Sequence, residues 1–216
     1  MLQYRSVHKE TLELLKELMV QKSLQDFFLV GGTALALQAG HRISLDIDMF
    51  TLKQFDSGEL LAELKTQFVI SDAAAGKNSL SFDAACSMGS NDSSVKVDLI
   101  RYSYPLLNPI ELIDGIRMLS IEDIIAMKLS AISGRGAKKD FYDIFYLLHK
   151  YSVREMFSLF KAKYPAVNEF QIIKSLTYFD DADLEQDPQT MEKVSWEEIK
   201  TVITREMRSY TSSREL

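Results

Sequence analysis

The sequence predicts an α+β (mixed α/β) fold, with a small mixed sheet in the first half and a C-terminal helical portion. Short apolar runs of strand length, separated by polar turns, recur before residue 119. From Ser120 onward the apolar residues follow helical spacing instead. The 216 residues are 46% hydrophobic, which supplies a proper core. We therefore predict one domain over residues 1–119 and a helical domain over residues 120–216.

The composition excludes several classes of protein. The formal net charge is −6, so any contact with nucleic acid must be local. One cysteine cannot form an internal disulfide, and no C-x-x-C motif or Cys/His cluster is present to bind zinc. No apolar run reaches the roughly 18 residues that a membrane helix needs. We expect a cytoplasmic protein that does not enter a membrane.

The N-terminal region predicts a helix and then a strand, a glycine turn and a second helix. Residues 9–22 place leucines at i,i+4 spacing among lysines and glutamates, which is typical of an amphipathic helix. The apolar residues 27–30 meet Gly31 and Gly32, and strong helix formers follow up to a stop at Gly40. The backbone N–H groups at the start of this second helix, together with the Thr33 hydroxyl, could bind phosphate.

Residues 43–50 predict a strand that carries two carboxylates on one face. Apolar and polar residues alternate there, so Asp46 and Asp48 are expected to point the same way. Such a pair lies about 6 to 7 Å apart, which suits two magnesium ions about 3.5 to 4 Å apart. Asp98, in a strand predicted over residues 95–100, could join as a third ligand or as the general base.

The remaining elements follow from periodicity, capping signals and turn residues. The first half also predicts a helix capped by Ser57, strands over residues 68–71 and 79–84, and a loop over residues 73–78. The second half predicts helices that begin at a Ser120 cap and continue over residues 138–150, 153–163, 168–176 and 196–210. The acidic residues 180–189 are expected to form a linking loop.

Each chemical motif alone has an ordinary explanation. An Asp-x-Asp pair can be a solvated strand face, and two glycines before a helix can be a tight turn. Here strand, Gly-Gly-Thr, helix and a strand with two carboxylates follow in order within about twenty residues. This combination favours a phosphate site beside a metal site.

Two segments resemble a known family. LVGGTALAL over residues 29–37 and GHRISLDIDMF over residues 40–50 resemble the first motif of the AbiEii/AbiGii nucleotidyltransferase toxin family, within the polymerase-beta nucleotidyltransferase superfamily. AMKLSA over residues 126–131, Arg135 and KKDFYDIFYLL over residues 138–148 resemble its second signature. The glycine motif reads Gly-Gly-Thr where the wider superfamily more often has Gly-Ser.

The resemblance implies a polymerase-beta-like nucleotidyltransferase core over residues 1–119 and a helical domain that completes the nucleotide cleft. The implied reaction moves an NMP from an NTP with Mg²⁺ held by Asp46, Asp48 and Asp98, and Gly31, Gly32 and Thr33 binding the nucleotide. For relatives that act as toxins, the implied acceptor is tRNA and the implied partner is a separate antitoxin protein.

The second signature also brings four positive charges, at Lys128, Arg135, Lys138 and Lys139, into twelve residues of an acidic protein. Spacing alone favours Lys128 with its ammonium in water, Lys139 paired with Asp143, and Asp140 paired with Arg135. The resemblance instead favours Lys128, Arg135 and Lys139 as nucleotide ligands, with Asp140 and Asp143 in support. Tyr142 could stack on a base.

Two alternatives to an RNA acceptor stay open from the sequence. The same transfer chemistry could be directed to a hydroxyl of a protein or of a small molecule. A second alternative is a protein of the same fold that binds a nucleotide without turnover.

Overall fold

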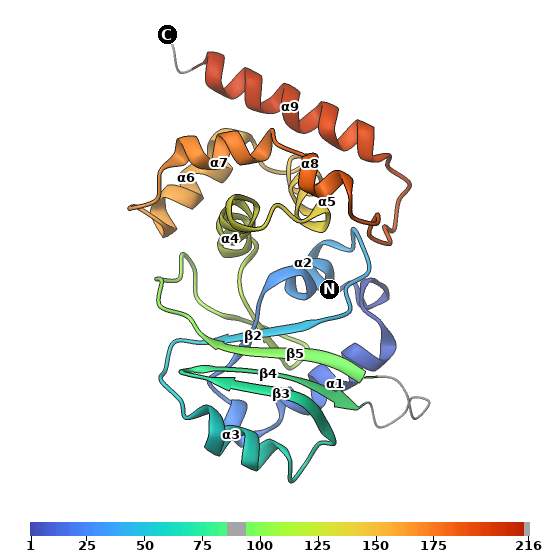
Figure 1. The fold of residues 1–216 in the computed structure, drawn as a ribbon, viewed down its shortest axis with the longest axis vertical. Coiled ribbons are helices and arrows are strands. Elements are labelled where there is room, and N and C mark those ends of the chain that lie inside the picture. Colours follow the sequence, from blue (N-terminus) through green and yellow to red (C-terminus); the bar gives the residue numbers. More distant parts are fainter. Residues whose placement is uncertain (86–93, 214–216) are drawn as a thin grey trace. The chain divides into compact units, whose positions relative to one another are not determined.

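The computed structural model describes residues 1–85 and 94–213 (Figure 1). The chain divides into two compact units. The sheet unit comprises Met1–Ser103 and Pro109–Ser120, and the helical unit comprises Tyr104–Asn108 and Ile121–Leu216. The short segment Tyr104–Asn108 therefore belongs to the helical unit, although it precedes the last two strands of the sheet unit in the sequence.

A seven-stranded mixed sheet forms the sheet unit, and this confirms the predicted fold class. Its order is β3-β4-β5-β2-β1-β7-β6. The central strand β2 runs parallel to β5 and antiparallel to β1, which in turn runs parallel to β7. The strands are β1 (Phe28–Leu29), β2 (Ile47–Thr51), β3 (Ile70–Gly76), β4 (Ser79–Ala85), β5 (Ser94–Arg101), β6 (Glu111–Ile113) and β7 (Ile116–Met118).

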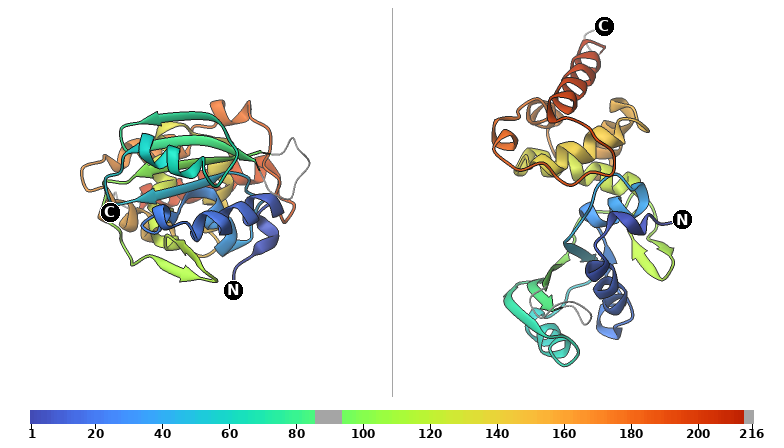
Figure 2. Two further views of the ribbon diagram at one scale, coloured as in Figure 1. Left: turned by 90° about the horizontal axis from the view of Figure 1, so that it is seen from below. Right: turned by 90° about the vertical axis from the view of Figure 1, so that its right-hand side faces the viewer.

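Three α-helices accompany the sheet, namely α1 (Lys9–Met19), α2 (Gly31–Ala39) and α3 (Ser57–Leu64), with 3₁₀ turns at Tyr4–Ser6 and Lys22–Leu24. Helix α1 packs on β5 and β7, and α3 packs on the β3–β4 hairpin (Figures 1 and 2). The predicted cap of α3 is wrong by one residue. Asp56 accepts hydrogen bonds from the backbone of Gly58 and Glu59, whereas the Ser57 hydroxyl donates to the Gly76 carbonyl at 2.7 Å.

The two faces of the sheet differ along β5. Val95, Val97 and Leu99 are buried, and they alternate with more accessible residues that include Lys96 and Asp98. Apolar side chains therefore form the core on one face, and the opposite face keeps its polar side chains accessible to a ligand.

The strand predicted over residues 43–50 is shorter in the structure. Strand β2 begins at Ile47, and the expected alternation fails before it, because Leu45 is 54% exposed and Ser44 is buried. Ser44 forms an isolated parallel bridge with Val7 and donates its N–H to the Ser6 carbonyl at 2.9 Å. This contact with the N-terminal segment turns the polar residue inward.

Two further strand predictions need correction. The predicted strand over residues 68–71 and loop over residues 73–78 are replaced by β3, which continues to Gly76 as an edge strand with mostly exposed side chains. The β6–β7 hairpin was not predicted, because its strands have three residues each. Its two turn residues, Asp114 and Gly115, both have positive φ, as a type I′ turn requires.

Helices fill the helical unit, as predicted: α4 (Ile121–Gly134), α5 (Lys138–Leu147), α6 (Val153–Lys163), α7 (Glu169–Leu176), α8 (Asp180–Asp183) and α9 (Trp196–Ser212). Helix α4 packs against α5, α6 and α7, and α9 packs against the same three helices. The acidic residues 180–189 are not a plain linker, because they include α8. In the described residues no helix combines the length and the apolar character that crossing a membrane would require.

A fully buried ion pair attaches Tyr104–Asn108 to the helices. Lys163 in α6 lies 2.5 Å from the Asp123 carboxylate in α4, and its ammonium also donates to the Pro105 carbonyl at 2.9 Å. The same carboxylate accepts the backbone N–H groups of Leu107 and Asn108. The segment is thus held by polar contacts that exclude water.

Candidate active site

Gly31 begins α2 in a conformation and a space that only glycine fits. Its φ is +67°, and a Cβ added there would lie 2.8 Å from Oδ2 of Asp48. The neighbouring Val30 donates its N–H to the Asp48 carbonyl at 2.9 Å. The start of α2 and the carboxylate strand are therefore in direct contact, as a joint phosphate and metal site requires.

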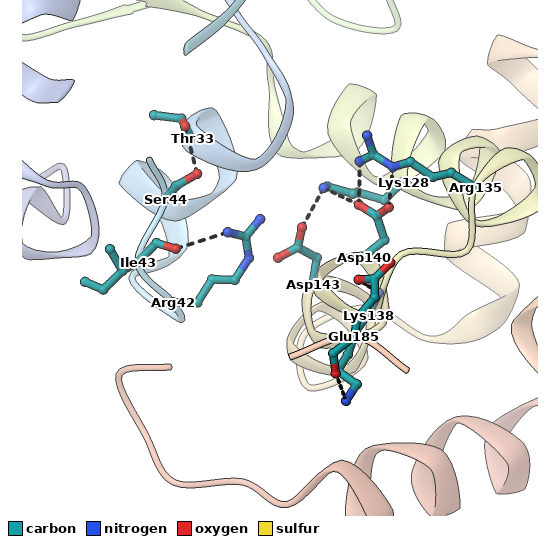
Figure 3. A network of polar contacts seen from close by, with 10 residues as sticks. All are labelled: Thr33, Arg42, Ile43, Ser44, Lys128, Arg135, Lys138, Asp140, Asp143 and Glu185. Atoms are coloured by element: carbon teal, nitrogen blue, oxygen red, sulfur yellow. Dashed lines mark hydrogen bonds and ion pairs between the residues drawn. The ribbon is translucent and has the colours of Figure 1, made fainter. Parts of the chain in front are cut away.

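Gly32 makes room for a guanidinium group. A Cβ at Gly32 would lie 2.5 Å from Nη2 of Arg42, a residue that is 4% exposed. The other terminal nitrogen of Arg42 donates to the Ile43 carbonyl at 3.1 Å, as Figure 3 shows. Arg42 therefore places a positive charge at the N-terminal end of α2. From the sequence, Arg42 could only be suggested as a phosphate contact, because it stands just before the carboxylate strand.

The Thr33 hydroxyl has a different role from the predicted one. Thr33 is 1% exposed, and its hydroxyl lies 2.8 Å from the Ser44 hydroxyl and donates to the Asp46 carbonyl (Figure 3). It therefore fastens α2 to the residues that lead into β2, and it is not directed at a bound phosphate. The backbone N–H groups at the start of α2 remain the candidate phosphate donors.

The structure brings the predicted carboxylates together around one ammonium group. Asp48 and Asp98 are direct partners in the parallel pair β2–β5, so their side chains lie on the same face. Nζ of Lys96 lies 3.2 Å from Oδ2 of Asp98. The hydrogen bond and charge of Asp98 raise the pKa of Lys96, and the charges of Asp46 and Asp48 raise it further. All three carboxylates thus act on the same cation.

The donor set fits a hard divalent cation. Among residues 1–85 and 94–213, no three His, Cys, Asp or Glu side chains stand in a geometry that would hold an ion as they are. Carboxylate oxygens are nevertheless the ligands that Mg²⁺ prefers. The Lys96 ammonium beside Asp98 shows that the cluster already attracts a cation. Asp46, Asp48 and Asp98 are the residues that would hold magnesium here.

A hollow of about 320 Å³ lies beside Asp98, on the face of the sheet from which the Asp98 side chain projects. Small side chains of the β3–β4 hairpin, among them Ala74, Ser79 and Ser81, line it together with Ile100. Ser81 is the cross-strand partner of Asp98, so the hollow continues directly from the carboxylates. It contains hydroxyl groups and apolar surface but no basic side chain.

In the helical unit, Lys128 is buried and neutralised by two aspartates. Its ammonium lies 2.8 Å from Asp140 and 2.6 Å from Asp143 (Figure 3). The reading that placed the Lys128 ammonium in water is wrong, because the side chain is only 5% exposed. Asp143 contacts Lys128 and is fully buried, and its pair with Lys139 stays a prediction. Asp140 pairs with Arg135, as one reading expected.

Opposing effects act on the pKa of Asp140. Burial would raise this pKa, but the charge of Lys128 and the hydrogen bond and charge of Arg135 outweigh burial, so the pKa is lowered. Nε of Arg135 lies 2.8 Å from Asp140, while the arginine side chain stays 57% exposed. Asp140 is therefore held in its charged form by the two basic side chains that it contacts.

Tyr142 is a core residue. It is 4% exposed, and its ring stacks on Trp196 with centroids 6.0 Å apart. Burial, with a smaller effect of Asp187, raises the pKa of Tyr142 to about 12. The neighbouring Lys138 binds the Glu185 carbonyl and the Asp187 carboxylate, so the acidic segment closes over α5. The suggestion that Tyr142 stacks on a base is therefore wrong.

A mixed sheet with paired aspartates beside a Gly-Gly helix start is the framework of a nucleotidyltransferase. The model of the nucleotidyl transferase AbiEii toxin family, of type IV toxin–antitoxin systems, matches residues 13–215. The chain belongs to this family, which confirms the resemblance and the enzyme class. The Aquifex aeolicus protein aq_aa25 is 35% identical in an alignment 212 residues long, with 95% of this chain and 98% of that protein covered.

Solved structures share the fold. JHP933 from Helicobacter pylori has a TM-score of 0.58 and 21% identity, with 97% of this chain and 98% of that chain covered. MenT4, the nucleotidyltransferase toxin Rv2826c of Mycobacterium tuberculosis H37Rv, has a TM-score of 0.55 and 13% identity, with 93% of this chain and 84% of that chain covered. These likenesses extend over both units of the chain.

Proposed function

We propose that this nucleotidyltransferase depends on magnesium, transfers an NMP from an NTP to RNA, most specifically tRNA, and acts in the cytoplasm as a toxin controlled by an antitoxin protein. Membership of a toxin family supports the biological role. The single observation that carries the chemistry is the fit of the Asp48 carboxylate against Gly31, which joins the metal ligands to the phosphate cradle.

The proposed site residues of the sheet unit fall into metal ligands, phosphate donors and a proton acceptor. Asp46, Asp48 and Asp98 would hold two magnesium ions, which when bound would neutralise the triphosphate and lower the pKa of the acceptor hydroxyl. The backbone N–H groups of Gly31 and Gly32 donate to phosphate oxygens. The Asp98 carboxylate is also the candidate to accept the proton of the attacking hydroxyl.

Arg42 adds a charge that the backbone donors lack. Its buried guanidinium lies against Gly32, and a guanidinium can donate two parallel hydrogen bonds to a phosphate group. Because it carries its charge at every physiological pH, Arg42 would bind a polyphosphate without needing a proton from solution. We assign it to the triphosphate.

The hollow beside Asp98 is the proposed position of the acceptor. The attacking hydroxyl and the leaving pyrophosphate must lie roughly in line on opposite sides of the reacting phosphorus. The phosphate cradle lies on the Gly31 side of Asp48, and the hollow lies beyond Asp98 on the other side of β2. Hydroxyl groups of Ser79 and Ser81 suit an uncharged sugar better than a phosphate.

The basic residues of the helical unit stay predictions as nucleotide ligands. Lys128 and Arg135 are already engaged by Asp140, so a phosphate would have to share or displace these contacts. Arg135 is the better placed of the two for an incoming anion, because its side chain is largely exposed. Lys139 is proposed as a further phosphate contact, with Asp140 and Asp143 orienting the cations.

The acceptor is tested with radiolabelled NTPs, Mg²⁺ and three separate pools: total tRNA, cellular protein and small hydroxyl compounds. We expect label on tRNA from the wild-type chain and none from the Asp46→Asn/Asp48→Asn double variant. Label confined to protein or to a small molecule would overturn the RNA acceptor while leaving the transfer chemistry in place.

A second measurement separates an enzyme from a protein that only binds nucleotide. Calorimetry should detect NTP binding that depends on Mg²⁺ in the wild-type chain and is at least about tenfold weaker in the double variant. Tight binding without transfer to any of the three pools would favour a nucleotide-binding protein without turnover. Co-expression with a neighbouring antitoxin gene, with growth as the readout, tests the toxin role.

A further inference from the structure

The Lys96 ammonium lies beside Asp98, one of the three proposed metal ligands. Lys96 precedes Asp98 by two residues on β5, so both side chains project from the same face of the strand. Its ammonium lies 3.2 Å from Oδ2 of Asp98 and feels the charges of Asp46 and Asp48. A charged lysine cannot coordinate a metal ion, and a metal cation bound at Asp98 would repel the Lys96 ammonium.

We infer that Lys96 is an internal counter-ion, which neutralises the carboxylates in the absence of metal and leaves Asp98 when magnesium binds. The inference rests on the proposed metal role of Asp46, Asp48 and Asp98. It adds that metal binding is a cation exchange, so the lysine lowers the affinity of the free enzyme for magnesium.

A second carboxylate is positioned to receive the displaced lysine. Asp83 on β4 is the direct cross-strand partner of Lys96 in the antiparallel pair β4–β5. Side chains at such paired positions have Cβ atoms about 4.5 to 5.5 Å apart, within reach of an ion pair. The Lys96 side chain is 55% exposed, so it can move from Asp98 toward Asp83 without disturbing the core. Lys96 therefore has two alternative partners on one surface.

The first test measures the chemical reactivity of single lysines. Acylation with a small N-hydroxysuccinimide ester, read by mass spectrometry, is compared without metal and with saturating Mn²⁺ at one fixed pH. We expect the labelling rate of Lys96 to change at least about twofold, because its partner changes. Lys53 is the matched control, since it forms the same kind of lysine–aspartate pair in the same unit, with Asp26 at 2.7 Å.

The second test measures Mn²⁺ affinity by calorimetry without nucleotide. Lys96→Met should bind Mn²⁺ about 3 to 10 times more tightly than the wild type, because a competing charge is gone. Asp83→Asn should bind it more weakly, because the displaced lysine loses its second partner. Lys53→Met should match the wild type. None of these measurements depends on turnover.

The outcomes separate the two proposals. If Mn²⁺ binding is absent from the wild type, or equal in the wild type and Asp48→Asn, the proposed metal site itself fails. If the wild type binds Mn²⁺ through Asp48 but Lys96→Met binds it equally or less tightly, the counter-ion role is overturned and the metal site stands. An unchanged labelling rate of Lys96 on metal binding would also overturn it.

Discussion

The absence of a side chain at Gly31 affects both the proposed metal ligand Asp48 and the proposed phosphate donors of α2. The Asp48 carboxylate occupies the space that a Cβ would take, and the positive φ of Gly31 aims the first N–H groups of α2. At Gly32, the Arg42 guanidinium occupies the space that a Cβ would take. The two glycines therefore have different neighbours, although they are adjacent in the sequence.

Gly31→Ala tests this close fit. The substitution should cost about 1 to 2 kcal/mol of the free energy of unfolding, because alanine is strained at positive φ and meets Asp48. NTP affinity should fall at least about tenfold, since the carboxylate must move. Urea unfolding and calorimetry measure both. Gly134→Ala is the control, because a Cβ there meets no atom within 4 Å; an equal loss in both variants would contradict the explanation.

Asp140 predicts an acid-sensitive element in the helical unit. Its pKa is lowered in the folded protein, so its contribution to stability is present above the unfolded value of 3.8 and is lost as pH falls through the folded value. Stability should therefore decline steeply below about pH 4. Asp140→Asn should flatten this decline, as followed by urea unfolding at a series of pH values. An unchanged slope in the variant would show that other carboxylates are responsible.

At the scale of elements, short polar contacts decide positions that periodicity cannot. The alternation of β5 was read correctly because one of its faces packs on the core. Strand β3 was mostly missed, since an edge strand with exposed alanines carries no alternating signal. Ser44 is buried because it bridges to Val7, a contact between distant residues that leaves no local pattern.

The buried pair of Lys163 and Asp123 is the contact to test at this scale. Lys163→Met should cost about 3 to 5 kcal/mol of the free energy of unfolding, because Asp123 keeps its charge without its cation. The double variant Lys163→Met/Asp123→Leu should recover part of that loss. Urea unfolding measures both, with Lys161→Met, an exposed lysine of the same helix, as control. A loss below about 1 kcal/mol in Lys163→Met would contradict the anchoring role.

For the whole molecule, nucleotide binding should appear as a gain in stability. A ligand that binds only the folded chain raises the free energy of unfolding by about 2.7 kcal/mol at one hundred times its dissociation constant. Thermal unfolding with NTP and Mg²⁺ should therefore show a raised Tm for the wild type. Asp48→Asn should show almost none of this increase. A shift of equal size in the variant would place the nucleotide away from the carboxylates.

The sequence was sufficient for the fold class and for the order of motifs, because strand, glycine turn, helix and Asp-x-Asp are local patterns. It was insufficient for the site residues that depend on distant contacts. Arg42 reaches Gly32 only after α2 has folded back, and the Thr33 hydroxyl is already bonded to residues eleven and thirteen positions away. The Lys96 contact depends on side-chain reach along β5, which spacing alone did not reveal.

The course of Tyr104–Asn108 bears on how this protein can be dissected. The chain leaves the sheet unit after Ser103, contributes five residues to the helical unit, and returns at Pro109 for its last two strands. A fragment cut at residue 120 would take Leu107 and Asn108 away from the Asp123 carboxylate that they help to solvate. The remaining helical fragment would keep a buried acid that has lost two donors. The helical half cut at residue 120 is therefore incomplete, and a stable truncation of the helical unit would have to carry residues 104–108 on a new linker.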